Sequence, residues 1–424
     1  MNDSTILILI TIMIVALIDY VPRAFLLFKK AIINKPSYTK TPQYLLMPTV
    51  YGNISYLQNI KFLKKYPGKV LICTSLHETP EFYRELRKVC RKFGFRYTKA
   101  ALPIVKGRPV KNAYTIYKGA LHNFYRLGIK RDTPCILMDA DTYATDNVNN
   151  LVRTFINSGL DIASLRCEAN NPKNIIEVLQ AFEYKIAMDN RRMDPWLTSG
   201  ACNIAKAHVF QHVLSCHSNF FAGGDIEIGK LARVMGYKIN HIDFTFYTAV
   251  PDTFKSWYMQ RIIWFAGGFR HHITNIASYG WHHFFILFYN SLLVYLLLPL
   301  RWIELLNFPY TMLFLIILSW VYTYVLIAGK GWKKEYLLLP FYSFIQSMII
   351  IPVAFIRYVK LAWIHRSFGF LKYDLSHTTI SSRVVSSILN ITSAIFIFFA
   401  AYSFTASRVA YWLTNGHLMK ALFR

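Results

Sequence analysis

Acidic residues are scarce in this sequence, because 22 Asp and Glu stand against 48 Lys and Arg in 424 residues, a formal net charge of +26. A basic excess of this size indicates nucleic acid, anionic lipid or a phosphorylated substrate as a partner. No basic and aromatic nucleic-acid module is recognisable, which argues against nucleic acid. Long apolar segments favour the other two partners, since anionic headgroups attract basic juxtamembrane segments by about 1 kcal/mol per Lys or Arg.

Cysteine is also scarce, and the absence of any CxxC pair argues against a zinc site. The six cysteines are Cys73, Cys90, Cys135, Cys167, Cys202 and Cys216. All lie between the first and second apolar segments, where we expect reduced thiols if this region is cytosolic. A signal peptide is disfavoured, because the start carries Asp3, no early Lys or Arg, and no small-residue cleavage site after the apolar run.

Hydrophobic residues make up 54% of the chain, too many for an ordinary soluble enzyme. The middle of the chain is nevertheless too charged for a pure membrane bundle, so two kinds of region are expected. Residues 4–28 predict an N-terminal transmembrane anchor. The basic residues Arg23, Lys29, Lys30, Lys35 and Lys40 place residue 30 onward in the cytosol by the positive-inside rule.

Residues 41–255 predict a cytosolic α/β domain. β-rich runs alternate with amphipathic helical stretches such as 80–93, which indicates a largely parallel sheet covered by helices. The runs are 44–50, 70–74, 135–138 and 162–165. In such sheets ligands bind at the carboxyl ends of the strands.

The region after residue 255 predicts interfacial helices over 256–282 and a membrane region over 283–405. Spans are expected near 283–300, 308–328 and 384–405. The apolar segment 336–357 is interrupted by Pro340 and Pro352. A span there would put the basic residues of 358–383 outside, against the positive-inside rule, so a re-entrant element is preferred and a plain span is the alternative.

The run Ile136-Leu-Met-Asp139-Ala-Asp141-Thr is the sharpest chemical feature. An apolar strand leads into two carboxylates whose i and i+2 positions point the same way, so both could reach one cation. Mg²⁺ or Mn²⁺ accepts such carboxylates together with substrate phosphates, and the cation would stabilise a diphosphate leaving group. The alternative is a solvated turn that caps the next helix.

Two further motifs follow. In Gly223-Gly224-Asp225-Ile226-Glu227, Asp225 is a candidate general base and Glu227 a candidate orienting residue, whereas the alternative is a plain helix N-cap. In Gln260-Arg261-Ile262-Ile263-Trp264, Arg261 could hold diphosphate and Trp264 could stack a sugar. An interfacial belt of basic and aromatic residues is the alternative for this second motif.

The ordered motifs resemble the family-2 inverting glycosyltransferases, closest to the membrane synthases of cellulose, chitin and hyaluronan, with ceramide glucosyltransferase as a relative. The resemblance spans about residues 41–375 and implies a GT-A-type domain inserted between transmembrane helices. It implies donor contacts at Pro48, Thr49, Tyr51, Glu78, Arg108, Lys111, Asp139 and Arg261. It further implies acceptor contacts at Gly200, Asn203, Gly224, Gln260 and Trp264, with Glu183 and Glu227 in support.

Three departures from the family pattern bear on these roles. Glu78 or His77 follows the second strand where an Asp is usual, and Gly224 replaces an acid of the base motif. Ile263 stands where an Arg is expected to bind phosphate, so Arg261 or Arg270 would have to compensate. The last change affects processivity more than catalysis.

The resulting hypothesis is metal-dependent inverting transfer from a nucleotide-sugar, with UDP-sugar favoured by the resemblance and Mn²⁺ or Mg²⁺ as cofactor. A polysaccharide synthase is the first reading, and non-processive glycosylation of a ceramide- or polyprenol-type lipid is the alternative. An inactive scaffold or transport component is the third. We expect a multi-pass protein of the plasma membrane that contacts anionic lipids, binds no nucleic acid, and could form homo-oligomers.

Overall fold

The computed structural model describes residues 32–33, 42–105, 107–217, 224–270, 317, 321 and 331–365. The chain divides into two compact units, which are described separately: one holds residues 23–257 and 361–375, the other 1–22, 258–360 and 376–424. The anchor predicted at 4–28 and the spans near 283–300 and 384–405 lie outside the described residues. The same holds for the span near 308–328, apart from residues 317 and 321.

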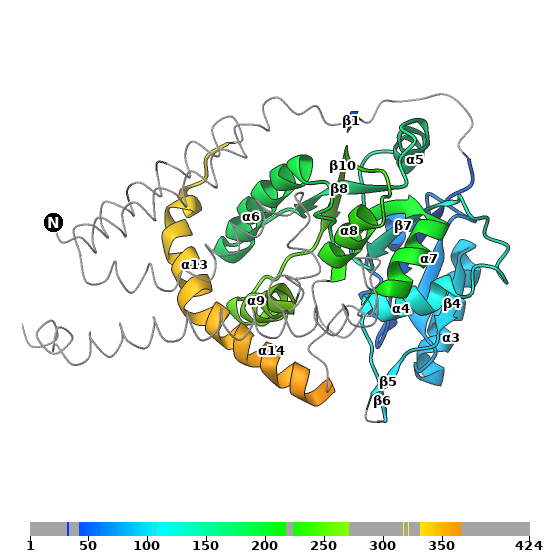
Figure 1. Ribbon diagram of the computed structural model, residues 1–424, viewed down its shortest axis with the longest axis horizontal. Helices are drawn as coiled ribbons and strands as arrows, with labels where there is room; N and C mark the ends of the chain where they lie inside the picture. The colour runs from blue at the N-terminus through cyan, green and yellow to red at the C-terminus, as the bar shows by residue number, and fades with distance from the viewer. Residues whose placement is uncertain are drawn as a thin grey trace, which may run out of the picture. The chain divides into compact units, whose positions relative to one another are not determined.

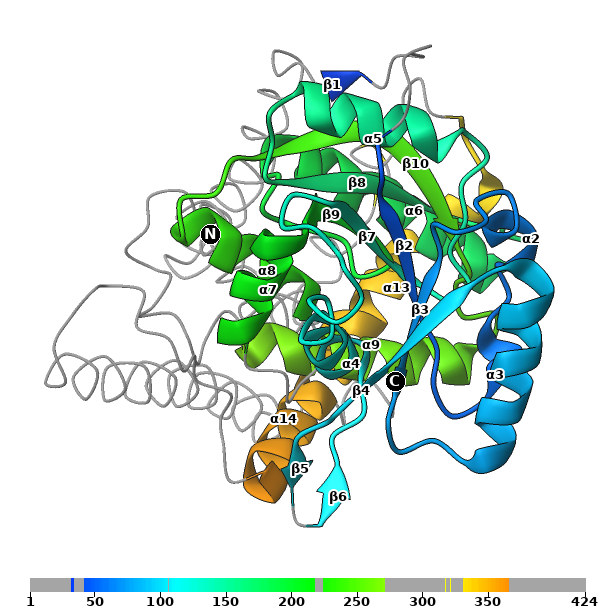
Figure 2. The same cartoon turned by 90° about the vertical axis from the view of Figure 1, so that its right-hand side faces the viewer.

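An eight-stranded sheet forms the centre of the first unit, in the order β1-β10-β8-β9-β7-β2-β3-β4 (Figures 1 and 2). Its strands are β1 (Ile32–Ile33), β2 (Leu45–Thr49), β3 (Leu71–Ser75), β4 (Arg96–Ala100), β7 (Pro134–Asp139), β8 (Ile162–Ala169), β9 (Cys202–Lys206) and β10 (Ile239–Thr248). All pairs are parallel except those of β9, which runs antiparallel to both β7 and β8. The sheet is therefore largely parallel, as predicted.

The four β-rich runs are confirmed as strands β2, β3, β7 and β8. Every residue of β2 and β3 is buried, as are the first five of β7. Helices cover both faces of the sheet, so these strands read as continuous apolar runs without alternation. All six cysteines are buried and free, in agreement with the predicted thiols.

Helices pack on both faces of the sheet (Figure 2). One face is covered by α2 (Ile60–Leu63), α3 (Pro80–Phe93) and α5 (Val148–Asn157), whose apolar side chains share one core cluster. The other is covered by α4 (Ala113–Leu121), α7 (Ala207–Cys216) and α8 (Gly224–Val234), which share a second cluster. The remaining helix, α6 (Ile175–Met193), packs against β8.

Local sequence explains where the site-bearing helices begin. Asn112 caps α4 by accepting from the Thr115 amide, and the Thr115 hydroxyl accepts from the Asn112 amide in return. The helix predicted over 80–93 is α3, which starts at Pro80 after the Thr79 cap and ends before Gly94 in the left-handed conformation. These caps fix α3 and α4 after the strands that lead to the candidate site.

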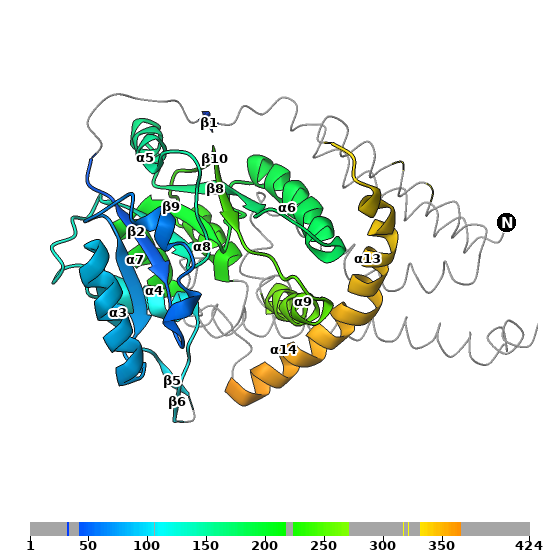
Figure 3. The same ribbon diagram turned by 180° about the vertical axis from the view of Figure 1, so that it is seen from behind.

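A short antiparallel hairpin, β5 (Ile104–Val105) and β6 (Arg108–Pro109), precedes α4 and stands apart from the main sheet (Figure 3). Arg108, predicted to contact the donor, lies on this hairpin and is exposed. No hydrogen bond or ion pair between described residues joins Arg108 to Asp139 or to Asp141.

The apolar stretch Lys334–His365 is 32 residues long and helical throughout, and its residues up to 360 belong to the second unit. It comprises η4 (Lys334–Leu338), α13 (Leu339–Ile345), a π-turn η5 (Gln346–Ile350) and α14 (Ile351–His365). By length and composition, it is the one helix among the described residues that could cross a membrane.

The predicted interruption by prolines in this stretch is wrong. Pro340 lies in the first turn of α13, where its missing N–H has no partner to lose. Pro352 follows the π-turn, which changes the hydrogen-bond register where Pro cannot donate. The helix therefore continues through both positions.

Candidate active site

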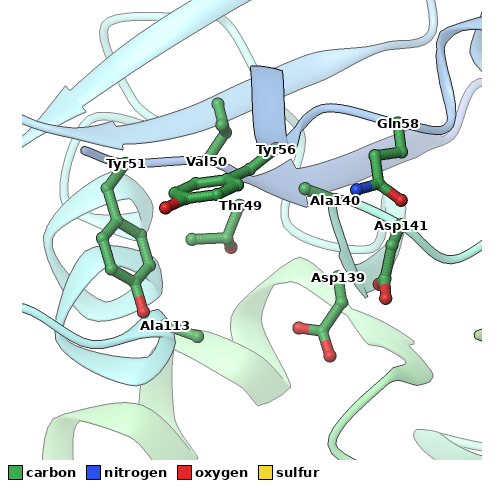
Figure 4. Close-up of a pocket in the computed structure, with 9 residues that line it drawn as sticks. All are labelled: Thr49, Val50, Tyr51, Tyr56, Gln58, Ala113, Asp139, Ala140 and Asp141. Atoms are coloured by element: carbon green, nitrogen blue, oxygen red, sulfur yellow. The ribbon is translucent and has the colours of Figure 1, made fainter. Parts of the chain in front are cut away.

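Asp139 is the last residue of β7, and Asp141 follows after one residue at the carboxyl end of the sheet. The turn is rigidly held, because the Ala140 carbonyl accepts from the amides of Gln58 (2.9 Å) and Asn59 (3.1 Å). The Asn59 side chain donates to the carbonyls of Asp139 (3.2 Å) and Thr142 (2.7 Å). Both carboxylates turn to the same side (Figure 4), as expected from their i and i+2 spacing.

The end of β10 holds the Asp141 carboxylate. Thr248 Oγ1 donates to Oδ1 at 3.3 Å, and the Ala249 amide donates to Oδ2 at 3.2 Å. These bonds lower the pKa of Asp141, but burial outweighs them and the pKa is raised. The turn-and-cap alternative does not describe this carboxylate, which is bound by a strand more than a hundred residues away in sequence.

Asp225 is the second residue of α8 and lies against the loop that precedes β9. The backbone amides of Ile226, Asp225 and Gly200 hydrogen-bond to its carboxylate. The Asp225 carbonyl accepts from the Thr198 hydroxyl. Burial nevertheless raises the pKa of Asp225, although the nearby Arg191 guanidinium opposes this. A carboxylate with a raised pKa is better matched to accepting a proton near neutral pH.

The charges of Asp141 and Asp225 both act on Asp139. Burial, then the charge of Asp141, then that of Asp225, raise the pKa of Asp139 to about 7. Like charges crowded in a desolvated pocket are costly unless a cation or a proton neutralises them. The fold therefore brings the two-carboxylate motif and the candidate base together from separate parts of the sequence.

A cavity of about 330 Å³ opens beside the two aspartates (Figure 4). It is lined by Thr49, Val50, Tyr51, Tyr56, Gln58, Ala113, Asp139, Ala140 and Asp141. Of the predicted donor residues, Thr49 and Tyr51 thus face the cavity, whereas Pro48 is buried within β2. Burial, followed by the charges of Asp139 and Glu78, raises the pKa of Tyr51, so its phenol lies near both carboxylates.

Glu78, three residues beyond the end of β3, is held on this side of the domain. Its Oε2 accepts from the Gly52 amide at 2.9 Å, and Lys111 Nζ lies 2.9 Å from its Oε1. Lys111 also donates to the His77 carbonyl. The predicted donor residues Glu78 and Lys111 therefore form an ion pair near Tyr51 of the cavity.

The loop predicted to contact the acceptor places its residues in different environments. A Cβ on Gly200 would lie 3.4 Å from Asp225 Oδ2, so this glycine borders the candidate base. Asn203, by contrast, is 1% exposed inside β9, and its amide nitrogen donates to the Ser199 carbonyl. The acceptor role predicted for Asn203 does not fit this burial, because the side chain supports the loop from beneath.

Gly224 and Glu227 lie in the first turn of α8. Glu227 is 1% exposed and its Oε2 lies 3.5 Å from His217 Nε2, which fits the predicted orienting role better than contact with substrate. A Cβ on Gly224 would meet Tyr114 Cδ2 at 2.6 Å and the His217 ring at 2.8 Å. The acid that is usual at this position would not fit here, since both rings occupy its space.

Four of the predicted residues lie on the helices α6 and α9. Glu183 is half-buried on α6. The helix α9 (Phe254–Phe269) carries Gln260, and the Arg261 guanidinium stacks 4.2 Å from the centre of the Trp264 ring. Trp264 is 43% exposed, whereas Arg261 is buried. The donor and acceptor roles of these three α9 residues stay predictions.

Four residues that the sequence did not single out support this site: Arg191, Tyr114, His217 and Thr248. Arg191 resembles a basic residue that complements a helix C-terminus, and Tyr114 resembles an ordinary core aromatic. Their roles depend on contacts between distant segments, which no local pattern reveals.

The donor set fits a divalent cation bound together with a substrate diphosphate. Within the described ranges no three His, Cys, Asp or Glu side chains gather as a complete metal cage. Asp139 and Asp141 supply two hard oxygen donors whose raised pKa values mark an uncompensated pair. Mg²⁺ and Mn²⁺ commonly bind through one or two carboxylates and complete their coordination with phosphates and water.

Comparisons with known proteins agree with this fold. Residues 135–327, which include the three aspartates, match the model of "Glycosyl transferase family group 2". No curated protein sequence matches the chain. Among solved structures, the fold is similar to that of the mannosyltransferase PcManGT from Pyrobaculum calidifontis in complex with GDP-Man and Mn²⁺, with a TM-score of 0.55 and 14% identity. The match covers 84% of this chain and 97% of that one. The chain is therefore a glycosyltransferase with a GT-A-like α/β fold.

Proposed function

We propose that the chain transfers a sugar from a nucleotide-sugar to a hydroxylated acceptor by metal-dependent inverting displacement. The carrying observation is that Asp139 and Asp141 line the cavity and that Asp225 lies close enough for its charge to act on Asp139, whose pKa is raised by burial and then by the charges of Asp141 and Asp225. Clustered carboxylates repel one another and destabilise the fold, but they suit a site that binds a cation and a nucleophile.

Each group has a role in this reaction. Asp139 and Asp141 would hold the cation, which would neutralise the charge of the diphosphate leaving group. Asp225 takes the proton of the acceptor hydroxyl while its oxygen bonds to the anomeric carbon. The bond from that carbon to the diphosphate breaks, and its electron pair departs with the diphosphate. One displacement inverts the configuration at the anomeric carbon.

The cavity offers two tyrosines and Gln58 for the nucleotide part of the donor. Tyr56 is 59% exposed at its mouth, where an aromatic ring could stack on a base. The resemblance found in the sequence favours a UDP-sugar, whereas the similar solved enzyme holds GDP-Man. The proposal therefore includes both nucleotides as candidates.

For the acceptor, we retain polysaccharide synthesis as the first candidate and a membrane lipid as the second. The apolar stretch Lys334–His365 supports work at a membrane surface in either case. Product length separates the two, because a labelled donor yields a long polymer in the first case and one sugar on an extractable lipid in the second.

The test is a donor screen with purified protein and Mn²⁺, comparing the wild type with Asp225→Asn. Release of UDP or GDP from one donor is expected, with a loss of roughly 10²- to 10⁴-fold in the variant. No release from any donor, with the variant equal to the wild type, would support the inactive scaffold.

A further inference from the structure

The space beside Asp225 is shaped by a second oxygen that none of the motifs includes. A Cβ placed on Gly200 would lie 3.4 Å from Asp225 Oδ2 and 3.6 Å from Tyr114 Oη. The carboxylate and the phenol thus border the same small space over a residue that has no side chain. Tyr114 comes from α4, directly after Ala113, which lines the donor cavity.

Neighbouring side chains fix the Tyr114 ring. It stacks on His217 with the ring centroids 5.2 Å apart and the planes 17° from parallel. His217 Nε2 donates to the Gly224 carbonyl at 2.9 Å and lies 3.5 Å from Glu227 Oε2, with both side chains almost fully buried. The same helix turn carries Asp225, so His217 connects the tyrosine to the candidate base.

Gly224 makes this arrangement possible. Any side chain there would displace the rings of Tyr114 and His217, which stand 2.6 and 2.8 Å from its missing Cβ. Tyr114 therefore fills the space beside Gly224, the position of the base motif at which an acid is usual. A phenol can donate one hydrogen bond and accept others without taking a charge.

We propose that Tyr114 contacts the attacking hydroxyl, with its Oη and the Asp225 carboxylate gripping that group over Gly200, while His217 acts as the positioning residue for both. This inference rests on the proposed function. The proton of the nucleophile still passes to Asp225, and Tyr114 only orients the oxygen. Water, the smallest hydroxyl nucleophile, is bound in the same way.

Donor hydrolysis by water tests the inference without knowledge of the acceptor. The probe is the nucleotide-sugar that gives the highest release in the screen, with Mn²⁺ present and kcat and KM measured separately. Tyr114→Phe keeps the ring stack and removes Oη alone, and Tyr125→Phe is the matched control because Tyr125 is 94% exposed. Melting temperatures establish that each variant is folded.

We expect Tyr114→Phe to lower kcat roughly tenfold with KM for the donor unchanged, as suits a hydrogen bond to the nucleophile. His217→Gln should lower kcat and shift the acid limb of the pH profile, since it disturbs the turn that holds Asp225. An unchanged kcat for Tyr114→Phe, or a rise in KM alone, would overturn the inference. A wild type without activity would instead contradict the proposed function.

Discussion

At Asp139, the charge that the proposed function requires destabilises the fold. Its raised pKa means that the folded protein binds a proton there which the unfolded chain releases above its ordinary pKa of 3.8. This carboxylate therefore destabilises the metal-free fold progressively as the pH rises from about 4 to about 7, and fully above that.

The variant Asp139→Asn should remove this penalty. At about 1.4 kcal/mol per pKa unit, we expect the metal-free variant to gain roughly 4 kcal/mol of unfolding free energy at pH 8 and almost none at pH 3. Thermal melting at the two pH values measures this. Equal melting temperatures for wild type and variant at pH 8 would show that the charge of Asp139 does not destabilise the fold.

Residue identities were predictable where a short motif carried them. Asp139 and Asp141 stood out because an apolar strand led into them, and Asp225 because glycines preceded it. The acceptor role predicted for Asn203 does not fit its burial, because the motif does not reveal whether a residue lies on the surface of the loop or in the strand beneath it. Tyr114 and Arg191 were not found, because their importance depends on neighbours from distant segments.

At the scale of elements, the end of β10 holds the turn that we propose binds the metal. Thr248→Val removes the hydroxyl that donates to Asp141 Oδ1 and preserves the shape of the side chain. Loss of a hydrogen bond to a metal ligand typically weakens metal binding by about 10- to 100-fold. We expect the Mn²⁺ concentration for half-maximal activity to rise accordingly.

Thr245→Val in the same strand is the control for this substitution, and it should leave the Mn²⁺ dependence unchanged. An unaltered dependence in Thr248→Val would mean that the Ala249 amide and the Thr142 hydroxyl suffice to position Asp141.

The first turn of α8 offers a steric test. Gly224→Ala places a methyl group 2.6 Å from the Tyr114 ring and should abolish most activity by displacing Asp225. Gly236→Ala is not an adequate control, because Gly236 has a positive φ of 80°. Ala232→Gly in the same helix, which creates no clash, serves better. Full activity in Gly224→Ala would contradict the close packing around Asp225.

Strands were easier to predict than their arrangement. Apolar runs marked β2, β3, β7 and β8, because strands buried on both faces need no alternation. The antiparallel insertion of β9 between β7 and β8 had no local signal, as it depends on how the chain returns after α6. Over Lys334–His365 the sequence left a re-entrant element and a plain span open, and the helix continues through both prolines because the position of a proline, and not its presence, decides whether a helix continues.

At the scale of the whole molecule, composition predicts membrane attachment. A chain with 54% hydrophobic residues and a 32-residue apolar helix should remain in the membrane pellet after an alkaline carbonate wash. Immunoblotting of pellet and supernatant measures this, with a soluble domain protein as control. Release of the full-length chain into the supernatant would refute the multi-pass prediction.

The most direct test of the account is nucleotide release from the selected donor during a Mn²⁺ titration of the chelator-treated protein. We predict no turnover without metal, restoration by Mn²⁺ in the wild type, and none in Asp139→Asn at any Mn²⁺ concentration. Full turnover in excess chelator, or equal activity of the wild type and Asp139→Asn, would contradict the assignment of this site.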